Sequence, residues 1–348
     1  MKKAICYGAG HVFSRFHNEL AGLFDIVAVA DQKFEKSRNC KERYEYNAIS
    51  PNDITSFDFD VIIITTRYFV QVANFLVTQL GIKTDKINFQ CVLSTFGFDS
   101  IQYDAYSGGG WLCLSHSITI LFESQNDFDT FFHTVSSYSH KIVLTTVKYV
   151  LLDVGFNIGC TSLWYAQLPE VSKIFAYEPF EYTFRKGVAN VQRNPDIGAK
   201  INAINVGLGY GGSDILVKSM NCESKGANSV LPNCHNSNAD FEEEEKLVNI
   251  NVSLIDAGYE VKRVSSLYPG SSIIMKIDTE GSEYEIFDSL DKNSATDLID
   301  VFIVETHPVD GRSSDEIFYI LKKDYIICMT RDANNEWGTS EFIAIRRK

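Results

Sequence analysis

The sequence lacks an excess of positive charge, because 32 lysine and arginine residues stand against 45 aspartate and glutamate residues, and the formal net charge is −13. A broad surface for nucleic acids or membranes needs clustered basic side chains. The composition therefore disfavours both classes of partner, although it leaves room for a local basic patch. We expect no nucleic-acid partner.

Long apolar segments are also missing. No stretch approaches the roughly 18 apolar residues that a membrane-spanning helix needs, and the apolar run after the first lysines is too short for a secretory signal. The eight cysteines form no Cys-x-x-Cys pair, and no histidine spacing indicates zinc. We therefore expect a cytoplasmic protein with reduced thiols and no membrane span.

The chain instead alternates short apolar strands with helices, which favours an α/β fold with parallel sheets. Its 348 residues suffice for two domains. We predict two Rossmann-like domains, at residues 1–98 and 149–348, with a connector and lead-in helix at 99–148. Residues 207–272 are too many for a simple connection, so we predict an insertion there.

The motif that organises the chain is YVLLDVGFNIG at residues 149–159. An apolar strand ends at Asp153, a loop with Gly155, Asn157 and Gly159 follows, and the next residues are typical of a helix start. Sheets of this class bind nucleotide-like ligands at such a turn. Because like charges repel, Asp153 disfavours a pyrophosphate. It favours a ligand with a positive group, such as the ammonium of S-adenosylmethionine.

Two further strand ends extend this predicted cofactor site. Glu178 ends the second strand, about 20 residues after the loop, where an acid can accept hydrogen bonds from both ribose hydroxyls. Asn205 ends the third strand, where it can reach an adenine edge. The predicted cofactor-binding residues are Asp153, Gly155, Asn157, Gly159, Glu178 and Asn205.

Two later strand ends, in the segments KIDTEG and VETH, predict a reaction site. Side chains alternate along an extended strand, so Lys276, Asp278 and Glu280 share one side, as do Glu305 and His307. We predict His307, Asp278 and Glu280 as catalytic. Imidazole is the natural base by its ordinary pKa, and a carboxylate could serve if burial raises its pKa. A structural ion pair of Lys276 with one carboxylate is the competing interpretation.

We predict no metal site, but one alternative stays open. Asp278, Glu280 and Glu305 together with His307 could hold a divalent cation that lowers the pKa of a hydroxyl. Full activity of the enzyme after treatment with a chelator would exclude this alternative.

A second glycine turn, Gly8-Ala9-Gly10, follows the first strand of the chain. The segment GAGHVF nearly matches the dinucleotide fingerprint GxGxxG, with Phe13 at the third glycine position and Asp31 about 20 residues on. A bound nucleotide or nucleotide-linked sugar and a purely structural turn both stay open. The alternative function is an NAD(P)-dependent oxidoreductase or a nucleotide-sugar-binding module acting through this domain, although an evident catalytic Tyr-Lys pair is missing.

Five segments resemble those of the FkbM family of S-adenosylmethionine-dependent methyltransferases. In chain order they are LLDVGFNIGCTS, IFAYEPFEYTF, INAINVGLG, IIMKIDTEGSEYEIFDSL and FIVETHP. The resemblance covers residues 112–348, and its most specific piece is KIDTEGSE. Phe156 departs from the small residue that the family commonly has at this position.

The resemblance implies a class I methyltransferase fold, whose mostly parallel sheet has seven strands with the last one antiparallel. It also implies that the first loop and Glu178 bind S-adenosylmethionine. The usual reaction of the family is O-methylation of a sugar or polyketide hydroxyl. We therefore expect an O-methyltransferase of carbohydrate biosynthesis that acts on a small-molecule or nucleotide-linked sugar acceptor. The acceptor's identity and the oligomeric state stay open.

Overall fold

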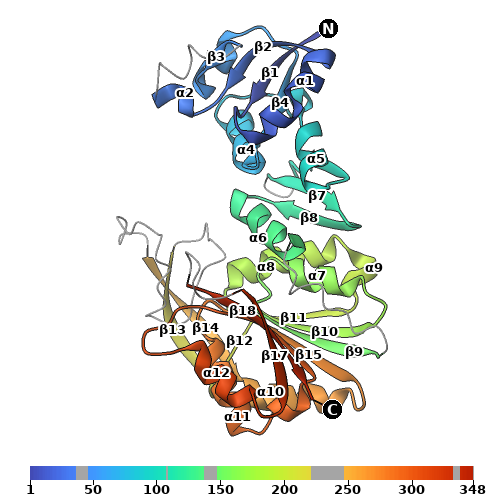
Figure 1. Cartoon of the computed structure of the whole chain (residues 1–348), viewed down its shortest axis with the longest axis vertical. Helices are drawn as coiled ribbons and strands as arrows, with labels where there is room; N and C mark the ends of the chain where they lie inside the picture. Colours follow the sequence, from blue (N-terminus) through green and yellow to red (C-terminus); the bar gives the residue numbers. More distant parts are fainter. Residues whose placement is uncertain (37–45, 107–108, 137–146, 221–246, 332–337, 348) are drawn as a thin grey trace. The chain divides into compact units, whose positions relative to one another are not determined.

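The computed structural model describes residues 1–36, 46–106, 109–136, 147–220, 247–331 and 338–347. The chain divides into two compact units, Met1–Asp129 and Thr130–Lys348, shown in Figure 1. The division lies within helix α6, whereas the sequence predicts domain ends at residues 98 and 148.

Unit 1 begins with alternating strands and helices. Its elements are β1 (Lys2–Tyr7), α1 (His11–Leu23), β2 (Phe24–Ala30), α2 (Lys33–Lys36), β3 (Ala48–Ile49), η1 (Pro51–Ser56), β4 (Val61–Ile64), α4 (Phe69–Thr78), η2 (Thr84–Lys86), β5 (Ile87–Asn88) and α5 (Gln90–Phe96). The strands form a parallel sheet in the order β3-β2-β1-β4-β5. The carboxyl ends of β1 and β2 therefore lie side by side, at the edge where the glycine turn begins.

The remainder of unit 1 is antiparallel. It consists of β6 (Ser100–Tyr103), β7 (Trp111–Ser115) and β8 (Ile118–Phe122), followed by the start of α6 (Gln125–Ser136). Phe128 of α6 packs at ring-centroid distances of 4.9 Å from Phe69 and 6.0 Å from Phe122. Aromatic packing of this kind stabilises beyond simple area burial, which explains why the start of α6 belongs to unit 1.

Unit 2 is built around a seven-stranded sheet. Its strands are β9 (Tyr149–Val154), β10 (Val171–Tyr177), β11 (Ile201–Ile204), β15 (Ser272–Ile277), β16 (Val301–Thr306), β17 (Tyr325–Arg331) and β18 (Ser340–Arg346). Their order is β11-β10-β9-β15-β16-β18-β17, and β18 alone runs opposite to the other strands. The predicted α/β class and the mostly parallel sheet with an antiparallel last strand are confirmed.

Helices and short helical turns connect these strands. They are α7 (Cys160–Ala166), α8 (Glu181–Gln192), α9 (Pro195–Gly198), α10 (Ala257–Leu267), α11 (Glu283–Lys292), η5 (Thr296–Leu298) and α12 (Ser314–Leu321). A separate three-stranded sheet in the order β12-β14-β13 lies within the predicted insertion, where β12 is Gly207–Gly209, β13 is Ser213–Met220 and β14 is Leu247–Asp256. The four consecutive glutamates at residues 242–245 lie outside the described residues.

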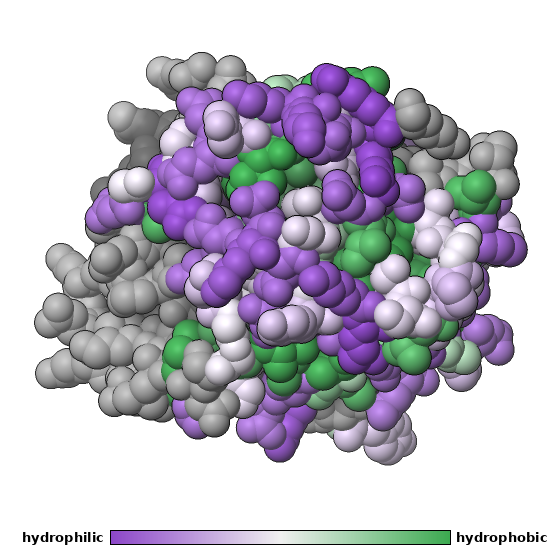
Figure 2. Space-filling model, turned by 90° about the horizontal axis from the view of Figure 1, so that it is seen from below, coloured by the Kyte–Doolittle hydropathy of each residue, from purple (hydrophilic) through white to green (hydrophobic). Residues whose placement is uncertain are grey.

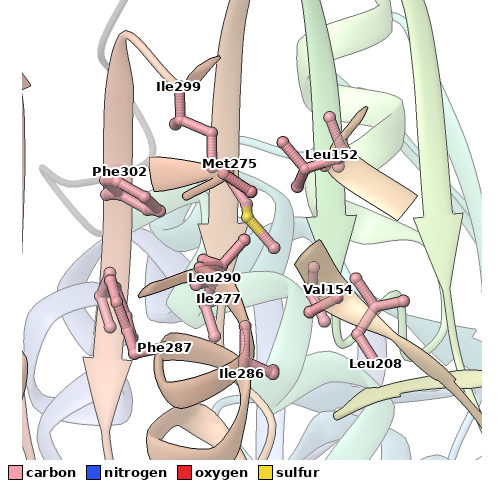
Figure 3. Close-up of a cluster of buried hydrophobic side chains, with 14 of the residues drawn as sticks. Leu152, Val154, Leu208, Met275, Ile277, Ile286, Phe287, Leu290, Ile299 and Phe302 are labelled. Atoms are coloured by element: carbon pink, nitrogen blue, oxygen red, sulfur yellow. The ribbon is translucent and has the colours of Figure 1, made fainter. Parts of the chain in front are cut away.

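The core of unit 2 covers both faces of the large sheet. In Figure 3, Ile286, Phe287 and Leu290 of α11 lie against Met275 and Ile277 of β15 and their neighbours. The opposite face packs against α7 through a second apolar cluster. Because both faces are covered, the central strands are mostly apolar, and their charged residues lie near the carboxyl ends. Each fully buried side chain of this size contributes roughly 1.5–3 kcal/mol, which holds the strand ends in fixed positions.

The face of the molecule seen from below in Figure 2 is largely polar. On the face shown in Figure 2, hydrophilic residues predominate and apolar residues form small, separate groups. This agrees with helices that bury one face and expose the other. No helix among the described residues combines the length and apolar character needed to cross a membrane.

Candidate active site

The register of three parallel strands aligns the predicted site residues. Asp153 at the end of β9 lies beside Lys276 of β15, and Ile277 of β15 lies beside Val304 of β16. Asp278 directly follows β15. The carboxyl ends of the strands thus meet at one edge of the sheet, where α/β folds bind ligands.

A buried ion pair occupies the centre of this edge. Asp153 is 0% exposed and accepts a hydrogen bond from Ser162 Oγ at 2.6 Å. Lys276 Nζ lies 3.5 Å from Asp153 Oδ1 and 3.4 Å from Asp278 Oδ2, and it donates to the Gly155 carbonyl at 3.0 Å. Burial would lower the pKa of Lys276, but the two carboxylates raise it above its usual value.

The positive partner of Asp153 is therefore supplied by the chain itself. The sequence argument assigned this partner to a ligand ammonium, whereas the structure places Lys276 there. Asp153 has no exposed surface, and it is linked to the glycine loop through Lys276, which donates to the Gly155 carbonyl. Its direct contact with a cofactor stays a prediction.

The loop after β9 depends on glycine for space and conformation. Gly155 has φ +88°, and a Cβ atom there would lie 1.9 Å from the backbone oxygen of Asp278. Gly159 has φ +87° and stands directly before α7. Asn157 also has a positive φ, of 50°, which asparagine tolerates better than most residues. The predicted loop residues thus lie together at the end of the sheet.

Phe156 fits into this loop because α8 has a glycine opposite it. A Cβ atom on Gly187 would lie 2.3 Å from the Phe156 ring and 2.6 Å from the Asn157 carbonyl oxygen. Phe156 is consequently buried rather than directed at the ligand edge. This pairing explains how the chain accommodates the departure from the family's small residue.

Glu178 links the loop to the end of β10. Its Oε2 accepts from Asn157 N at 2.9 Å, and its Oε1 accepts from Phe180 N at 3.1 Å. Burial raises the pKa of Glu178 to about 7. Each oxygen keeps accepting capacity, because a carboxylate offers about four lone-pair sites. The Asn205 side chain donates to the Glu178 carbonyl at 2.8 Å, so the structure brings Asn157, Glu178 and Asn205 together.

The three predicted catalytic residues also converge. His307 Nε2 lies 3.5 Å from Glu280 Oε2 and 3.9 Å from Asp278 Oδ1. The reason differs from the alternation argument, which assumed an extended strand. β15 ends at Ile277, and Glu280 reaches His307 through a tight turn in which its own φ is +56°. Such a conformation is uncommon outside glycine and often marks functional sites.

Glu283 is a site residue that sequence reasoning missed. It is fully buried in the first turn of α11, and its Oε1 accepts from His307 Nδ1 at 3.0 Å, from Thr279 N at 2.9 Å and from Gly281 N at 3.1 Å. Because a carboxylate only accepts, Nδ1 carries the proton and Nε2 points to the cluster. The sequence did contain one signal for Glu283, namely an acidic residue at the start of a predicted helix, three residues after Glu280.

The cluster retains protons near neutral pH. Burial alone would lower the pKa of His307, but the Glu280 and Glu283 charges raise it well above its usual value. Burial raises the pKa of Glu280 to about 7. Burial, and then the Asp278 charge, raise the pKa of Glu305 to about 8. The pKa of His307 thus differs from that of a free imidazole, so its ordinary pKa does not make it the base.

Arg331 and Glu341 extend the site beyond the predicted residues. The Arg331 guanidinium pairs with Glu305 and lies 2.8 Å from Glu341 Oε1. The guanidinium therefore compensates two carboxylates that the sequence places far apart. A pocket adjoins them, lined by Lys276, Ile277, Asp278, Ile303, Val304, Glu305 and Glu341.

The glycine turn of unit 1 is satisfied by its own chain. Asp31 Oδ2 accepts from Ala9 N at 2.7 Å, and Asp31 Oδ1 accepts from Lys33 N at 2.9 Å. Lys33 Nζ donates to the Ala9 carbonyl at 2.8 Å. These contacts favour the structural interpretation of Asp31, and a nucleotide at this turn stays a prediction.

Two family models match the chain. Residues 153–327 match the methyltransferase FkbM domain, and residues 1–88 match the C2185-like N-terminal domain. The match for the first residues does not by itself confirm the Rossmann-like domain that the sequence predicts. No curated protein matches the chain in sequence.

Several solved structures are similar to the chain, at low scores. Methyltransferase FkbM from Methylobacillus flagellatus KT is 13% identical with a TM-score of 0.39, over 99% of this chain and 90% of that one. TrmK from M. capricolum, in complex with S-adenosyl-homocysteine, is 12% identical with a TM-score of 0.34, over 61% and 69%. A predicted O-methyltransferase from Agrobacterium tumefaciens is 11% identical with a TM-score of 0.32, over 60% and 79%. These scores establish neither acceptor nor cofactor.

Proposed function

The chain belongs to the FkbM methyltransferase family, and from this premise we propose that it transfers a methyl group from S-adenosylmethionine to a hydroxyl of a sugar, a glycan precursor or a similar small molecule. The observation that carries the proposal is the convergence of the glycine loop, Glu178 and the Asp278–Glu280–His307 cluster at one edge of the sheet.

The residues at this edge fit S-adenosylmethionine. Glu178 is only 6% exposed, yet each of its oxygens can accept a further hydrogen bond, as ribose hydroxyls require. Gly155 and Gly159 let the backbone approach a ligand closely, as glycines do in nucleotide sites. When bound, the cofactor supplies an electrophilic methyl group on a sulfonium.

The acceptor hydroxyl would lie at the cluster formed by Asp278, Glu280 and His307. These side chains orient the hydroxyl in line with the bond that breaks and assist the loss of its proton. Glu283 fixes His307 through the Nδ1 hydrogen bond, so that Nε2 faces the acceptor. Three polar groups around one hydroxyl suit a polar, oxygen-rich acceptor better than an apolar one.

Two measurements on the full-length chain test the proposal. Calorimetry should detect binding of S-adenosylhomocysteine and no binding of NAD. Transfer of a labelled methyl group to a panel of sugars and nucleotide-linked sugars should then fall by at least about 100-fold in His307→Ala, with S-adenosylhomocysteine affinity unchanged. Binding of NAD in place of S-adenosylhomocysteine would contradict the proposal and favour an oxidoreductase acting through unit 1.

A further inference from the structure

The cluster at the ends of β15 and β16 brings together more carboxyl groups than it has protein cations to pair with them. Four carboxylates lie within 4 Å of the His307 ring nitrogens, at 3.9 Å for Asp278, 3.5 Å for Glu280, 3.0 Å for Glu283 and 3.9 Å for Glu305. Charges this close and this buried repel strongly. A bound cation would relieve that repulsion.

The two cationic side chains beside the cluster, Lys276 and Arg331, pair with carboxylates other than Glu280. Lys276 pairs with Asp153 and with Oδ2 of Asp278, which leaves Oδ1 of Asp278 on the side of His307. Arg331 pairs with Glu305. Among the residues that the structure describes, the Glu280 carboxylate has no ion-pair partner except His307, and it accepts no hydrogen bond.

His307 presents an unused ligand atom to these oxygens. Its side chain is 8% exposed, and its Nδ1 is held by Glu283. Its Nε2 faces Glu280 and Asp278 at distances too long for good hydrogen bonds. A histidine that ligates a metal through one ring nitrogen usually donates its other N–H to a carboxylate, which fixes the ring. Glu283 has this position relative to His307.

The spacing of the three ligand atoms suits one cation. One atom each from Asp278, Glu280 and His307 lies within 4.8 Å of the other two. Two ligands of an octahedral cation at about 2.1 Å lie about 3.0 Å apart when adjacent and about 4.2 Å apart when opposite. The distances of 3.5 Å and 3.9 Å from Nε2 fall within this range.

We propose that Asp278, Glu280 and His307 bind a divalent cation, Mn²⁺ in preference to Mg²⁺, which chelates the acceptor through its hydroxyl and a neighbouring oxygen. Mixed carboxylate and imidazole ligation favours Mn²⁺ over Mg²⁺, which prefers oxygen alone. Three protein ligands leave positions open on a six-coordinate cation. The acceptor class is therefore a molecule with two adjacent oxygens, such as a vicinal diol or a hydroxyl beside a carboxylate.

The acceptor part of this inference rests on the proposed function, whereas the cation site stands without it. A hydroxyl bound to a divalent cation loses its proton more readily. The three ligands then assist proton loss through the cation, which fits their shared role around the acceptor.

A second cluster of the same kind is not a candidate. His133, Glu305 and Glu341 also lie close enough together to share an ion. However, the Arg331 guanidinium already pairs with both of these glutamates. A cation placed there would have to displace a guanidinium, so only the cluster around His307 carries the inference.

The test is a titration of the full-length, chelator-treated chain with Mn²⁺, followed by the electron paramagnetic resonance signal of the free ion. We expect one bound Mn²⁺ per chain. Asp278→Asn and Glu280→Gln should each weaken binding by more than about 100-fold, and Glu283→Gln by about 10- to 100-fold. Asp291→Asn, which removes one exposed carboxylate from α11, is the matched control and should bind like the wild type.

A folded wild type that binds no Mn²⁺ at millimolar concentration would overturn the site, as would equal losses in Asp291→Asn and the ligand variants. Thermal unfolding of each variant verifies that it is folded, and Glu280→Gln serves if Asp278→Asn does not fold. Titration with S-adenosylhomocysteine in the presence of chelator separates the two proposals. Its binding without any Mn²⁺ binding overturns the cation site alone, and Mn²⁺ binding without S-adenosylhomocysteine binding overturns the proposed function alone.

Discussion

The two units contain the same local arrangement with different surroundings. In each, a glycine turn follows the first strand, and an acid from the second strand accepts a hydrogen bond from the turn. Asp31 accepts from Ala9 N across 22 residues, and Glu178 accepts from Asn157 N across 21 residues. Asp31 is partly exposed, whereas Glu178 is buried and its pKa is raised to about 7 by that burial.

The neighbouring strand accounts for the larger difference. In unit 1, β4 is followed by Thr65, whose hydroxyl donates to the carbonyls of Tyr7 and Gly8 at 3.0 Å and 2.7 Å. In unit 2, the strand in the corresponding place carries Lys276, which pairs with Asp153 and is followed by Asp278. The turn of unit 1 is thus fixed by a neutral hydroxyl, whereas the turn of unit 2 lies beside an ion-pair network that includes the predicted catalytic residue Asp278. The glycine turn is therefore a shared structural element, and the residues on the neighbouring strand determine whether it forms part of a reaction site.

The largest expected effect is on stability. Lys276→Met leaves Asp153 buried without its counter-charge, so it should lower the free energy of unfolding of unit 2 by about 3–5 kcal/mol. Thr65→Val leaves two backbone acceptors short of one donor and should cost unit 1 about 1–3 kcal/mol. Denaturant unfolding, with the transition of unit 2 identified by its shift with S-adenosylhomocysteine, measures both. Equal costs would contradict the distinction between the two turns.

The second-largest expected difference between the units is the effect of alanine at each turn glycine. Both positions have positive φ, which costs about 1–3 kcal/mol for a residue with a side chain. At Gly155 the new Cβ atom would also lie 1.9 Å from the Asp278 carbonyl, compared with 2.8 Å from the Thr65 carbonyl at Gly8. Gly155→Ala should therefore shift Asp278 and abolish methyl transfer, whereas Gly8→Ala should leave turnover of the folded chain intact. Loss of turnover in Gly8→Ala would show that unit 1 contributes to the reaction.

A third pair of variants compares the two acids. Glu178→Gln should weaken S-adenosylhomocysteine binding by about 10- to 100-fold, since hydrogen bonds to charged groups contribute about 1.5–3 kcal/mol. The matched change Asp31→Asn should leave this affinity unchanged. Calorimetry on both variants provides the measurement. An equal loss in the two variants would mean that binding depends on unit 1 as well.

The smallest expected effect is a pH dependence of S-adenosylhomocysteine affinity, which should come from Glu178 and not from Asp31. Glu178 accepts ribose hydroxyls best as a carboxylate. With its pKa near 7, the ionised fraction rises from about one-tenth at pH 6 to about nine-tenths at pH 8. S-adenosylhomocysteine affinity should therefore rise about tenfold over this interval, and Glu178→Gln should make it flat.

Stability of the ligand-free chain should change in the opposite direction. The folded pKa of Glu178 lies above the unfolded value, so its contribution to stability is complete below the unfolded pKa and disappears as the pH rises through about 7. Thermal unfolding of the ligand-free chain at pH 6 and pH 8 measures this. Parallel changes in affinity and stability would contradict the assignment to Glu178.

Sequence reasoning reached the architecture and much of the site because both are local patterns. Apolar runs that end in glycine turns identify strands and their ends, and parallel strands bring those ends together. This placed Asp278 and His307 near one another. Glu280 was also named, although its position comes from a turn with positive φ rather than from strand alternation.

Contacts between distant elements could not be predicted in the same way. The hydrogen bond from His307 to Glu283 depends on where α11 begins, and the pair of Arg331 with Glu341 depends on β18 lying between β16 and β17. The raised pKa of His307 is a consequence of its nearness to Glu280 and Glu283. A base chosen by its ordinary pKa therefore misses what the fold does to it.

The contact between Phe156 and Gly187 restricts which residues these two positions can accept during evolution. The ring occupies the space that a side chain on α8 would need, and a glycine inside a helix costs about 1 kcal/mol relative to alanine. Neither residue can vary freely while the other stays. Because a Cβ atom at 187 would also lie 2.6 Å from the Asn157 carbonyl oxygen, alanine there requires both a small residue at 156 and a shift of the loop backbone, so the glycine should persist even where residue 156 is small.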